Sequence, residues 1–388
     1  MPLLLTLGVA LFVPNAGARA QPINSTVAVS VVSAPAPLFD RGIRGVTIGP
    51  IESSLQTNRG YGSAPFQNTL HRIQRMKGNW ISLTPFGRIW DLQPTGVDQS
   101  FEAPAAQTAA AVQQAVAQAH ARGLKVLIVP HLWAETGGWR GEIDPADELG
   151  WQRWAKAYRR FVLSWAKVAA ASDADMLAMG VELRSWVTTT HAPSFAELIR
   201  EVRRIYSGPL TYAANWDDVH DTVIWGDLDV IALNAFFPLA QKEGASWRSM
   251  LAESERLSVG IAELSQRWGK PVVFNEVGYT TRPDPALRPW EWPDGMKNVT
   301  VDQRAQADAY RALLAPFLDE PWFMGFFVWR WYADPDDMSQ EAEWGFSPFG
   351  KQAELVLRDA FATTWAADRS RPLHTVFSLR RAERVGSY

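Results

Sequence analysis

The chain has 388 residues, of which 47% are hydrophobic, and a formal net charge of -3 at pH 7. This near-neutral balance provides no basic field of the kind that binds nucleic acid, so we expect no nucleic-acid partner. The absence of cysteine excludes disulfides, thiolate metal sites and a cysteine nucleophile, and six His without a paired-His motif predict neither a metal nor a cofactor.

The N-terminus has the pattern of an export signal. We expect residues 1–20 to be a cleaved signal peptide, because Leu3 to Val13 are apolar and Ala18-Arg19-Ala20 fits a small-residue cleavage site. No Lys or Arg precedes the apolar run, which a start site placed too late would explain; an ordinary N-terminal anchor is the alternative. Residues 21–40 are predicted to be a linker or tether. No later segment is apolar and long enough to span a bilayer. The signal peptide predicts a secreted or periplasmic protein, and we expect a monomer.

From Arg41 onward, short apolar runs alternate with longer helical patterns. Strands are predicted at Gly42–Ile48, Asn79–Leu83, Lys125–Val129, Met176–Val181, Pro209–Ala213, Asp229–Leu233, Pro271–Phe274 and Met324–Trp329. Helices are predicted at Phe66–Met76, Ala105–Arg122, Trp151–Ala170, Ser194–Tyr206, Ser246–Trp268, Asp302–Leu318 and Lys351–Phe361. Gly123 and Gly269 are expected to end two of the helices, and Ser194 with Glu197 forms a candidate capping box.

The eight strand patterns favour a closed barrel. Near-continuous apolar strands separated by helices indicate a parallel sheet that is buried on both faces. No glycine-rich nucleotide motif follows the first strand, which removes the main reason for an open sheet. We therefore predict a single-domain α/β fold, a (β/α)8 TIM barrel over residues 41–365, followed by a C-terminal tail at 366–388.

In this architecture the active site lies at the carboxyl ends of the strands. Nearly every predicted strand end carries a Trp or Phe beside a hydrogen-bonding side chain. Sugars need both kinds of partner, because they present hydroxyls at the ring edge and C–H groups on the faces. The candidate substrate-binding residues at these ends are Trp90, His131, Trp139, Arg140, Asn215, Trp216, Asn234, Tyr279 and Trp329. Packing His and turn or cap Asn residues are the alternative interpretation for His131, Asn215 and Asn234.

Two carboxylates carry the most specific signal. Glu182 and Glu276 directly follow the fourth and seventh predicted strands, which places them on different sides of the barrel mouth. Two facing carboxyls serve glycoside hydrolysis, one as nucleophile and one as acid and then base. A salt-bridged strand-end residue is the alternative for each Glu taken alone. Glu142 and Asp144 form a rival pair, but opposed geometry is harder to build from residues two positions apart on one loop.

The chain resembles glycoside hydrolase family 113, the β-1,4-mannanase family of a large clan of retaining barrel glycosidases. The segments that carry the resemblance, over about residues 41–362, are GIRGVTIGP, GWRGEIDP, MGVELRSW, DVIALNAFFPL, KPVVFNEVGY and GFSPFGKQAE. The resemblance implies Glu182 as acid/base and Glu276 as nucleophile. It also implies that Trp139 and Arg140 border the cleft and that Trp329 forms the floor of the subsite for the scissile sugar.

Two positions depart from the wider clan. Val181 stands before Glu182, where most clan members place an Asn, although family 113 is similar in lacking it. The sixth-strand segment has Phe236 where a Tyr often supports the nucleophile, so Tyr279 or Asn275 is a candidate for that role. We expect Trp186 and Glu276 to raise the pKa of Glu182. We also expect either Arg184 or Arg330 to keep Glu276 ionised.

The expected function is double-displacement hydrolysis of a β-linked polysaccharide, with β-1,4-mannan as the leading substrate. The alternatives are a hydrolase of another β-glycan, a non-catalytic carbohydrate-binding barrel and a cell-envelope barrel protein. The insertion Pro283 to Val299 is rich in Pro and Trp and follows the nucleophile strand, so it is predicted to shape the product side of the cleft.

Overall fold

The computed structural model describes residues 39, 41–49, 57–292, 296–337 and 341–369. These residues belong to one compact unit that begins at Pro37. The predicted signal peptide, nearly all of the predicted linker and most of the predicted tail lie outside the described residues. Among the described helices, none has the length and apolar character needed to cross a bilayer.

Eight parallel strands close into a barrel, as the strand pattern predicted. They pair in the order β1-β10-β9-β8-β7-β6-β4-β2 and back to β1. Their bounds are β1 Ile43–Gly49, β2 Trp80–Leu83, β4 Lys125–Ile128, β6 Met176–Val181, β7 Leu210–Asn215, β8 Ile231–Asn234, β9 Val272–Val277 and β10 Phe323–Tyr332. Nearly all of these residues are buried, because side chains on one face fill the barrel and those on the other face meet the helices.

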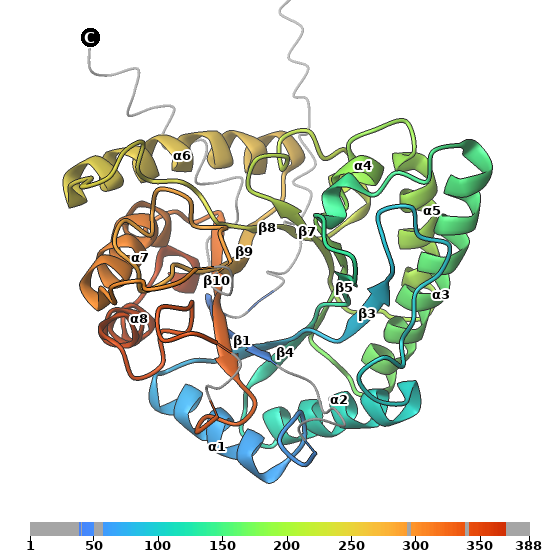
Figure 1. Ribbon diagram of the computed structural model, residues 1–388, viewed down its shortest axis with the longest axis horizontal. Coiled ribbons are helices and arrows are strands. Elements are labelled where there is room, and N and C mark those ends of the chain that lie inside the picture. Colours follow the sequence, from blue (N-terminus) through green and yellow to red (C-terminus); the bar gives the residue numbers. More distant parts are fainter. Residues whose placement is uncertain (1–38, 40, 50–56, 293–295, 338–340, 370–388) are drawn as a thin grey trace, which may run out of the picture. The chain divides into compact units, whose positions relative to one another are not determined.

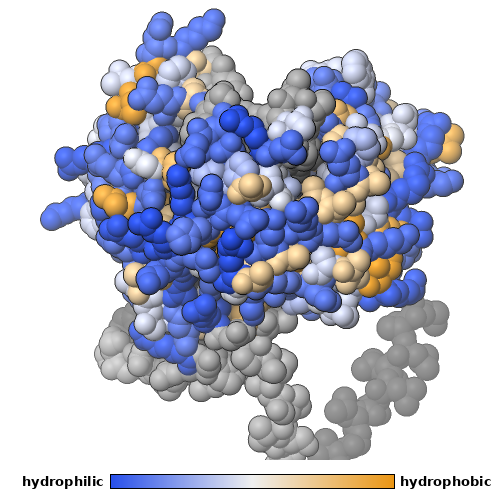
Figure 2. Space-filling model, turned by 90° about the horizontal axis from the view of Figure 1, so that it is seen from below, coloured by the Kyte–Doolittle hydropathy of each residue, from blue (hydrophilic) through white to orange (hydrophobic). Residues whose placement is uncertain are grey.

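Helices form the outer layer around the barrel (Figure 1). They are α1 Ala64–Arg75, α2 Ala105–His120, α3 Glu148–Ala171, α4 Arg184–Val187, α5 Ala192–Arg203, α6 Trp247–Trp268, α7 Gln303–Leu318 and α8 Gln352–Ala362, with short 3-10 helices at Arg140–Glu142, Ile224–Asp227 and Ala366–Arg369. The carboxyl end of α6 matches expectation, because Gly269 caps it with φ +63. At the other end, Ser246 is the N-cap and accepts from the Ser249 amide, whereas the sequence placed it inside the helix. The side of the molecule seen in Figure 2 is mostly hydrophilic, with smaller hydrophobic areas.

The candidate capping box at Ser194 is wrong. Helix α5 begins two residues earlier, at Ala192, so Ser194 lies within its first turn. The Ser194 hydroxyl donates to the carbonyl of His191 and accepts a 2.9 Å hydrogen bond from the indole of Trp186. A tertiary partner therefore replaces the local cap that the sequence pattern suggested.

Two short strands extend the barrel wall above its mouth. Strand β3 (Phe86–Ile89) follows β2, and β5 (His131–Ala134) follows β4. The β2–β4 pairing ends at Leu83 opposite Ile128, and the β3–β5 pairing resumes in the same register at Phe86 opposite His131. The sequence pattern missed this ribbon, because Pro85 and Pro130 interrupt both apolar runs and proline usually marks the end of a strand.

The amino end of β1 is held by side chains at and just beyond residue 365, where the predicted barrel ends. Arg44 of β1 forms a 2.7 Å ion pair with Asp368, and its guanidinium lies 4.0 Å from the ring centroid of Trp365. Asp368 also accepts from the amide of Gly42 at 2.9 Å. These contacts hold the first strand and the last described turn together at the amino end of β1.

Candidate active site

Local backbone geometry directs Glu182 into the barrel mouth. The β6–β7 register shifts between Ala178 and Val181, and Gly180 in this interval has φ +149. A Cβ at Gly180 would lie 2.1 Å from the hydroxyl of Tyr158, so only glycine fits there. Glu182 itself has φ +50, a left-handed conformation that is uncommon for a residue with a side chain and typical of functional positions.

Three donors from two segments that are far from Glu182 in the sequence hold its carboxylate. Oε2 accepts from the indole nitrogen of Trp139 at 2.8 Å and from Nη1 of Arg140 at 2.9 Å. Oε1 accepts from Nδ2 of Asn234 at 2.8 Å. Only 8% of the Glu182 surface is exposed. The structure thus brings four of the sequence-predicted residues together and fixes the orientation of one carboxylate.

Glu276 lies beside this group on β9. It stands opposite Asn234 in the β8–β9 ladder, and it is buried. Its Oε1 has no hydrogen-bond partner among the described residues. The Asn234 side chain accepts a 3.1 Å bond from Nδ2 of Asn275, which orients the amide that donates to Glu182. Asn275 therefore supports Asn234, and neither Asn275 nor Tyr279 donates to Glu276 in the structure.

The two carboxylates differ in electrostatic environment. Burial and the neighbouring Glu182 raise the pKa of Glu276 from 4.5 to about 8, while Arg140, Arg330 and Asn234 act in the opposite direction. The expectation that Trp186 would desolvate Glu182 is wrong, because Trp186 packs outside the barrel against Trp154 and Phe195.

His131 lies between Glu276 and Arg140, the arginine that holds Glu182. Its Nε2 lies 3.8 Å from Oε1 of Glu276 and 3.4 Å from Nη2 of Arg140. Its Nδ1 lies 3.3 Å from the carbonyl of Leu132, which favours the tautomer with the proton on Nδ1. Burial and the nearby arginines lower the pKa of His131 well below its usual value, so the imidazole is neutral and presents an acceptor toward Arg140.

Aromatic side chains form one wall beside the carboxylates. Phe236, Trp329 and Phe346 make a separate buried cluster, and Trp216 packs against it. The Trp329 ring lies 6.5 Å from the His131 ring, which places Trp329 next to the catalytic candidates. Phe346 is not among the predicted site residues, because its segment has no helix or strand pattern, although GFSPFGKQAE carries part of the family resemblance.

The insertion after β9 contributes two more indoles. Trp290 stacks on Trp216 with ring centroids 5.4 Å apart and planes at 21°, and it remains 47% exposed. Trp292 lies 5.6 Å from the ring of Phe346. Glu291 between them forms an ion pair with Arg282 that ties the loop down. The Pro- and Trp-rich composition was the only sequence signal for this arrangement.

The two candidate arginines have different roles. Arg184 forms a 2.6 Å ion pair with Asp217, and its guanidinium lies 4.3 Å from the centroid of the Trp139 ring. It therefore supports Trp139 and does not contact Glu276. Arg330 lies 5.2 Å from the Trp329 ring, forms no ion pair with the described residues, and lowers the pKa of Glu276.

Several other predicted residues are not brought to the carboxylates. Tyr279 is fully buried and packs edge-on against Tyr310 of α7, so the assignment of Tyr279 to substrate binding is corrected to a core role. Asn215 donates to Asp217 at 2.8 Å, which is a turn contact. Trp90 lies at the end of the β3–β5 ribbon and is 66% exposed. The rival Glu142 and Asp144 are both exposed, and Asp144 accepts from the Ala146 amide within its own loop.

A model described as Glycoside Hydrolase Family 113 matches residues 54–351. The chain belongs to glycoside hydrolase family 113. It is therefore a glycosidase, and the family resemblance and enzyme class expected from the sequence are confirmed. No curated protein matches the chain.

Solved structures agree with the family 113 assignment. A family 113 β-1,4-mannanase in a complex has a TM-score of 0.71 and 23% identity, over 83% of this chain and 99% of that chain. A family 113 β-mannanase from Alicyclobacillus acidocaldarius in complex with ManMIm has a TM-score of 0.71 and 25% identity, over 83% and 97%. A Ruminococcus gnavus β-glucuronidase shares the fold at a TM-score of 0.57 and 12% identity, over 83% of this chain and 50% of that chain.

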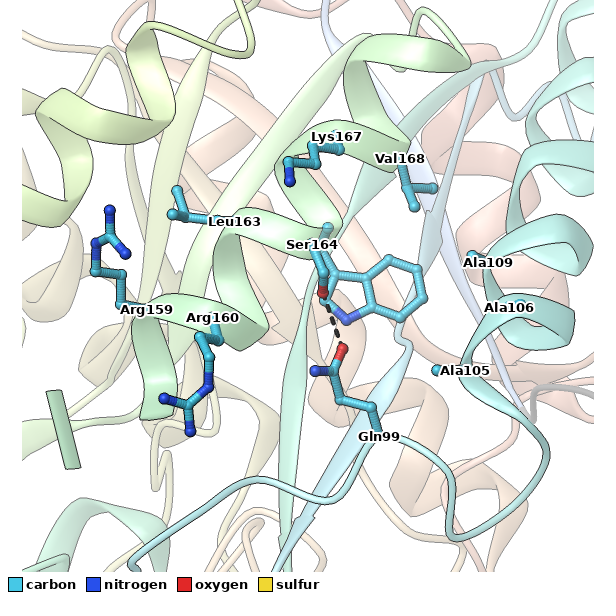
Figure 3. A pocket seen from close by; sticks show the side chains of 11 residues that line it. Gln99, Ala105, Ala106, Ala109, Arg159, Arg160, Leu163, Ser164, Lys167 and Val168 are labelled. Atoms are coloured by element: carbon cyan, nitrogen blue, oxygen red, sulfur yellow. Dashed lines mark hydrogen bonds between the residues drawn. The ribbon is translucent and has the colours of Figure 1, made fainter. Parts of the chain in front are cut away.

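A hollow of about 500 Å³ lies in the outer layer of this family 113 enzyme, between α2 and α3 (Figure 3). Ala105, Ala106 and Ala109 line one side, and Leu163 and Ser164 line the other. Ser164 donates to Gln99 at 2.8 Å across it. None of its lining residues is acidic, so this hollow cannot carry out two-carboxylate chemistry. Among the described residues, no group of three or more His, Asp or Glu is placed to hold a metal.

Proposed function

We propose that this family 113 glycosidase hydrolyses β-1,4-mannan by double displacement, with Glu276 as nucleophile and Glu182 as acid/base. The observation that carries the proposal is the pairing of two buried carboxylates at the barrel mouth, coupled through Asn234 and Arg140. The two similar family 113 structures are β-mannanases, which supports mannan as the substrate.

The first step breaks the glycosidic bond. A carboxylate oxygen of Glu276 attacks the anomeric carbon, and the bond to the leaving oxygen breaks while Glu182 gives that oxygen its proton. The unpartnered Oε1 of Glu276 is suited to this role, because no strong donor has to be released before attack. In the second step, a water molecule attacks the same anomeric carbon and gives a proton to Glu182, while the bond between that carbon and the Glu276 oxygen breaks.

The reaction needs one proton shared by the pair. With a pKa of about 8, Glu276 holds that proton in the free enzyme near neutral pH. Sugar binding has to move it to Glu182, because the nucleophile reacts ionised. A hydroxyl of the bound sugar that donates to Glu276 would replace the proton there, and Arg330 and Arg140 already favour the ionised form.

Aromatic rings supply the binding surface. Trp329 lies beside His131 and is suited to face the scissile sugar, while Trp216 and Trp290 form a stacked wall next to it. Indole faces match the C–H faces of pyranose rings, and the neighbouring polar groups fix orientation. We further propose that the enzyme is exported, on the basis of the apolar N-terminal run and its small-residue site.

The test is hydrolysis of mannan, glucan and chitosan by the wild type and by Glu182→Gln and Glu276→Gln. We expect reducing-sugar release from mannan, a loss of about 100- to 10,000-fold for Glu182→Gln and no turnover for Glu276→Gln. The anomer first released, followed by NMR, should retain the β configuration. Full activity of both variants would contradict the residue roles. Cleavage of glucan or chitosan, with no cleavage of mannan, would contradict mannan as the substrate. Release of the α anomer would exclude double displacement.

A further inference from the structure

The β3–β5 ribbon presents a row of large side chains on one face. Phe86 pairs with His131 and Arg88 pairs with Trp133 in the parallel ladder. Side chains alternate along a strand, so Phe86, Arg88, His131 and Trp133 share a face. The alternation carries Trp90, which follows the last residue of β3, to the same face. The rings of Phe86 and His131 lie 4.7 Å apart, which agrees with this register.

This face is the one that looks into the cleft. His131 reaches to 3.8 Å from Oε1 of Glu276, which lies inside the barrel mouth. The opposite face packs on the outer layer, because a Cβ at Gly87 would lie 2.8 Å from Phe161 of α3. Leu132 on that opposite face is buried in the main core with Phe161. The ribbon therefore has a core side toward α3 and a cleft side that begins at the nucleophile.

Exposure increases along the cleft side with distance from Glu276. His131 is 4% exposed, Trp133 is 53% exposed, and Trp90 is 66% exposed. Each step of two residues moves outward by about 6.6 Å along the strand direction. Trp133 and Trp90 are the two most exposed tryptophans among the described residues, and their position continues the row that starts at the catalytic pair.

The support for these rings is fixed by backbone and ionic contacts. The amide of Glu135 donates to the carbonyl of Ile89, and the amide of Thr136 donates to that of Trp90, each at 3.0 Å. Arg88 pairs with Asp98 at 2.9 Å and with Glu135 at 3.7 Å. Ordered backbone beneath exposed aromatic rings lowers the entropy cost of binding a ligand against them.

We propose that Trp133, with Trp90, forms a platform for sugar rings that lie further along the bound chain from the scissile bond. The occupant is the same β-linked polysaccharide, because the platform continues the row of side chains whose inner member, His131, lies 3.8 Å from Glu276. This inference rests on the proposed function for the identity of the glycan. Trp133 thereby gains a binding role, and Trp90 takes the outermost position in the row.

The test compares chain lengths. For Trp133→Ala and Trp90→Ala, kcat/KM on mannohexaose should fall about 2- to 10-fold per ring, whereas the value on an aryl β-mannoside should be unchanged. Trp133→Phe should retain part of the effect. Val259→Ala in α6 is the matched control, because Val259 is 55% exposed on an outer helix. Mannohexaose binding to the Glu276→Gln protein should weaken by the same factor when Trp133→Ala is added.

The outcomes separate the two proposals. If the wild type cleaves mannohexaose and both Trp→Ala variants match it in kcat/KM and in binding, the platform is overturned and the proposed function stands. If the wild type cleaves a different β-glycan, the same comparison is made with oligomers of that glycan, and a chain-length effect confined to long oligomers supports the platform. Equal losses on the aryl mannoside and the hexaose overturn the platform, because they indicate damage to the catalytic pair.

Discussion

Asn234 stands directly opposite Glu276 in the β8–β9 ladder, and its side chain donates at 2.8 Å to Oε1 of Glu182. Asn234 thus donates to one carboxylate and acts on the other, whose pKa it lowers. Because Nδ2 of Asn275 donates to Oδ1 of Asn234, the Asn234 amide nitrogen is directed toward Glu182 and its orientation is fixed.

We expect Asn234→Ala to lower kcat by about 10-fold or more, because a buried hydrogen bond to a charged group is lost and Glu182 becomes less well oriented. Asn234→Asp should be worse, since it adds a third carboxylate to the pair. Asn215→Ala is the matched control, because the Asn215 side chain donates to a turn residue, Asp217, and to neither carboxylate of the pair. Steady-state kinetics on mannan oligomers would decide, and equal kcat values for the Ala variants at 234 and 215 would contradict the role of Asn234.

The pH dependence of kcat/KM follows from the shared proton. With a pKa of about 8 for Glu276, the pair retains one proton below that pH and loses it above. We expect kcat/KM to fall as pH rises through about 8, because no proton remains for the leaving oxygen. Arg330→Met removes a charge that lowers this pKa, so the basic limb should move to higher pH. A basic limb that stays in place in Arg330→Met would show that Arg330 does not act on the pair.

The buried carboxylate of Glu276 should lower the free energy of unfolding near neutral pH. The folded-state pKa of Glu276 is raised from 4.5 to about 8, so its protonated form is the one that favours folding. That contribution is complete below the unfolded pKa and is lost as pH rises through the folded pKa. We expect Glu276→Gln to melt at a higher temperature than the wild type near neutral pH, with a difference that shrinks toward acid pH. Calorimetry at several pH values measures this, and a pH-independent difference would argue against a raised pKa.

Two conservative changes separate a site ring from a core ring. Trp139→Phe keeps an aromatic ring but loses the N–H that donates to Glu182, so kcat should fall by about 10-fold. Tyr279→Phe removes a hydroxyl that has no partner among the described residues, so activity should be unchanged and stability should not fall. An equal loss of kcat in Tyr279→Phe and Trp139→Phe would contradict the core role of Tyr279.

Much of the fold could be predicted from periodicity alone. The predicted strand Met176–Val181 coincides with β6, and the predicted helix Ser246–Trp268 differs from α6 by one residue. The β3–β5 ribbon could not be predicted, because its strands are short and follow Pro85 and Pro130. The capping box at Ser194 failed for a different reason, because the indole of Trp186 gives that hydroxyl a tertiary partner.

The sequence by itself determined that Glu182 and Glu276 share one edge of the molecule, since the carboxyl ends of parallel barrel strands meet there whatever the loops do. Only the tertiary structure decided which groups reach them. Trp139 and Arg140 reach Glu182 from the loop after β5, and Asn234 reaches it from the end of β8. Tyr279, three residues after Glu276, turns into the core. Side-chain direction at a loop depends on packing against segments far away in the chain, which strand and helix periodicity does not encode.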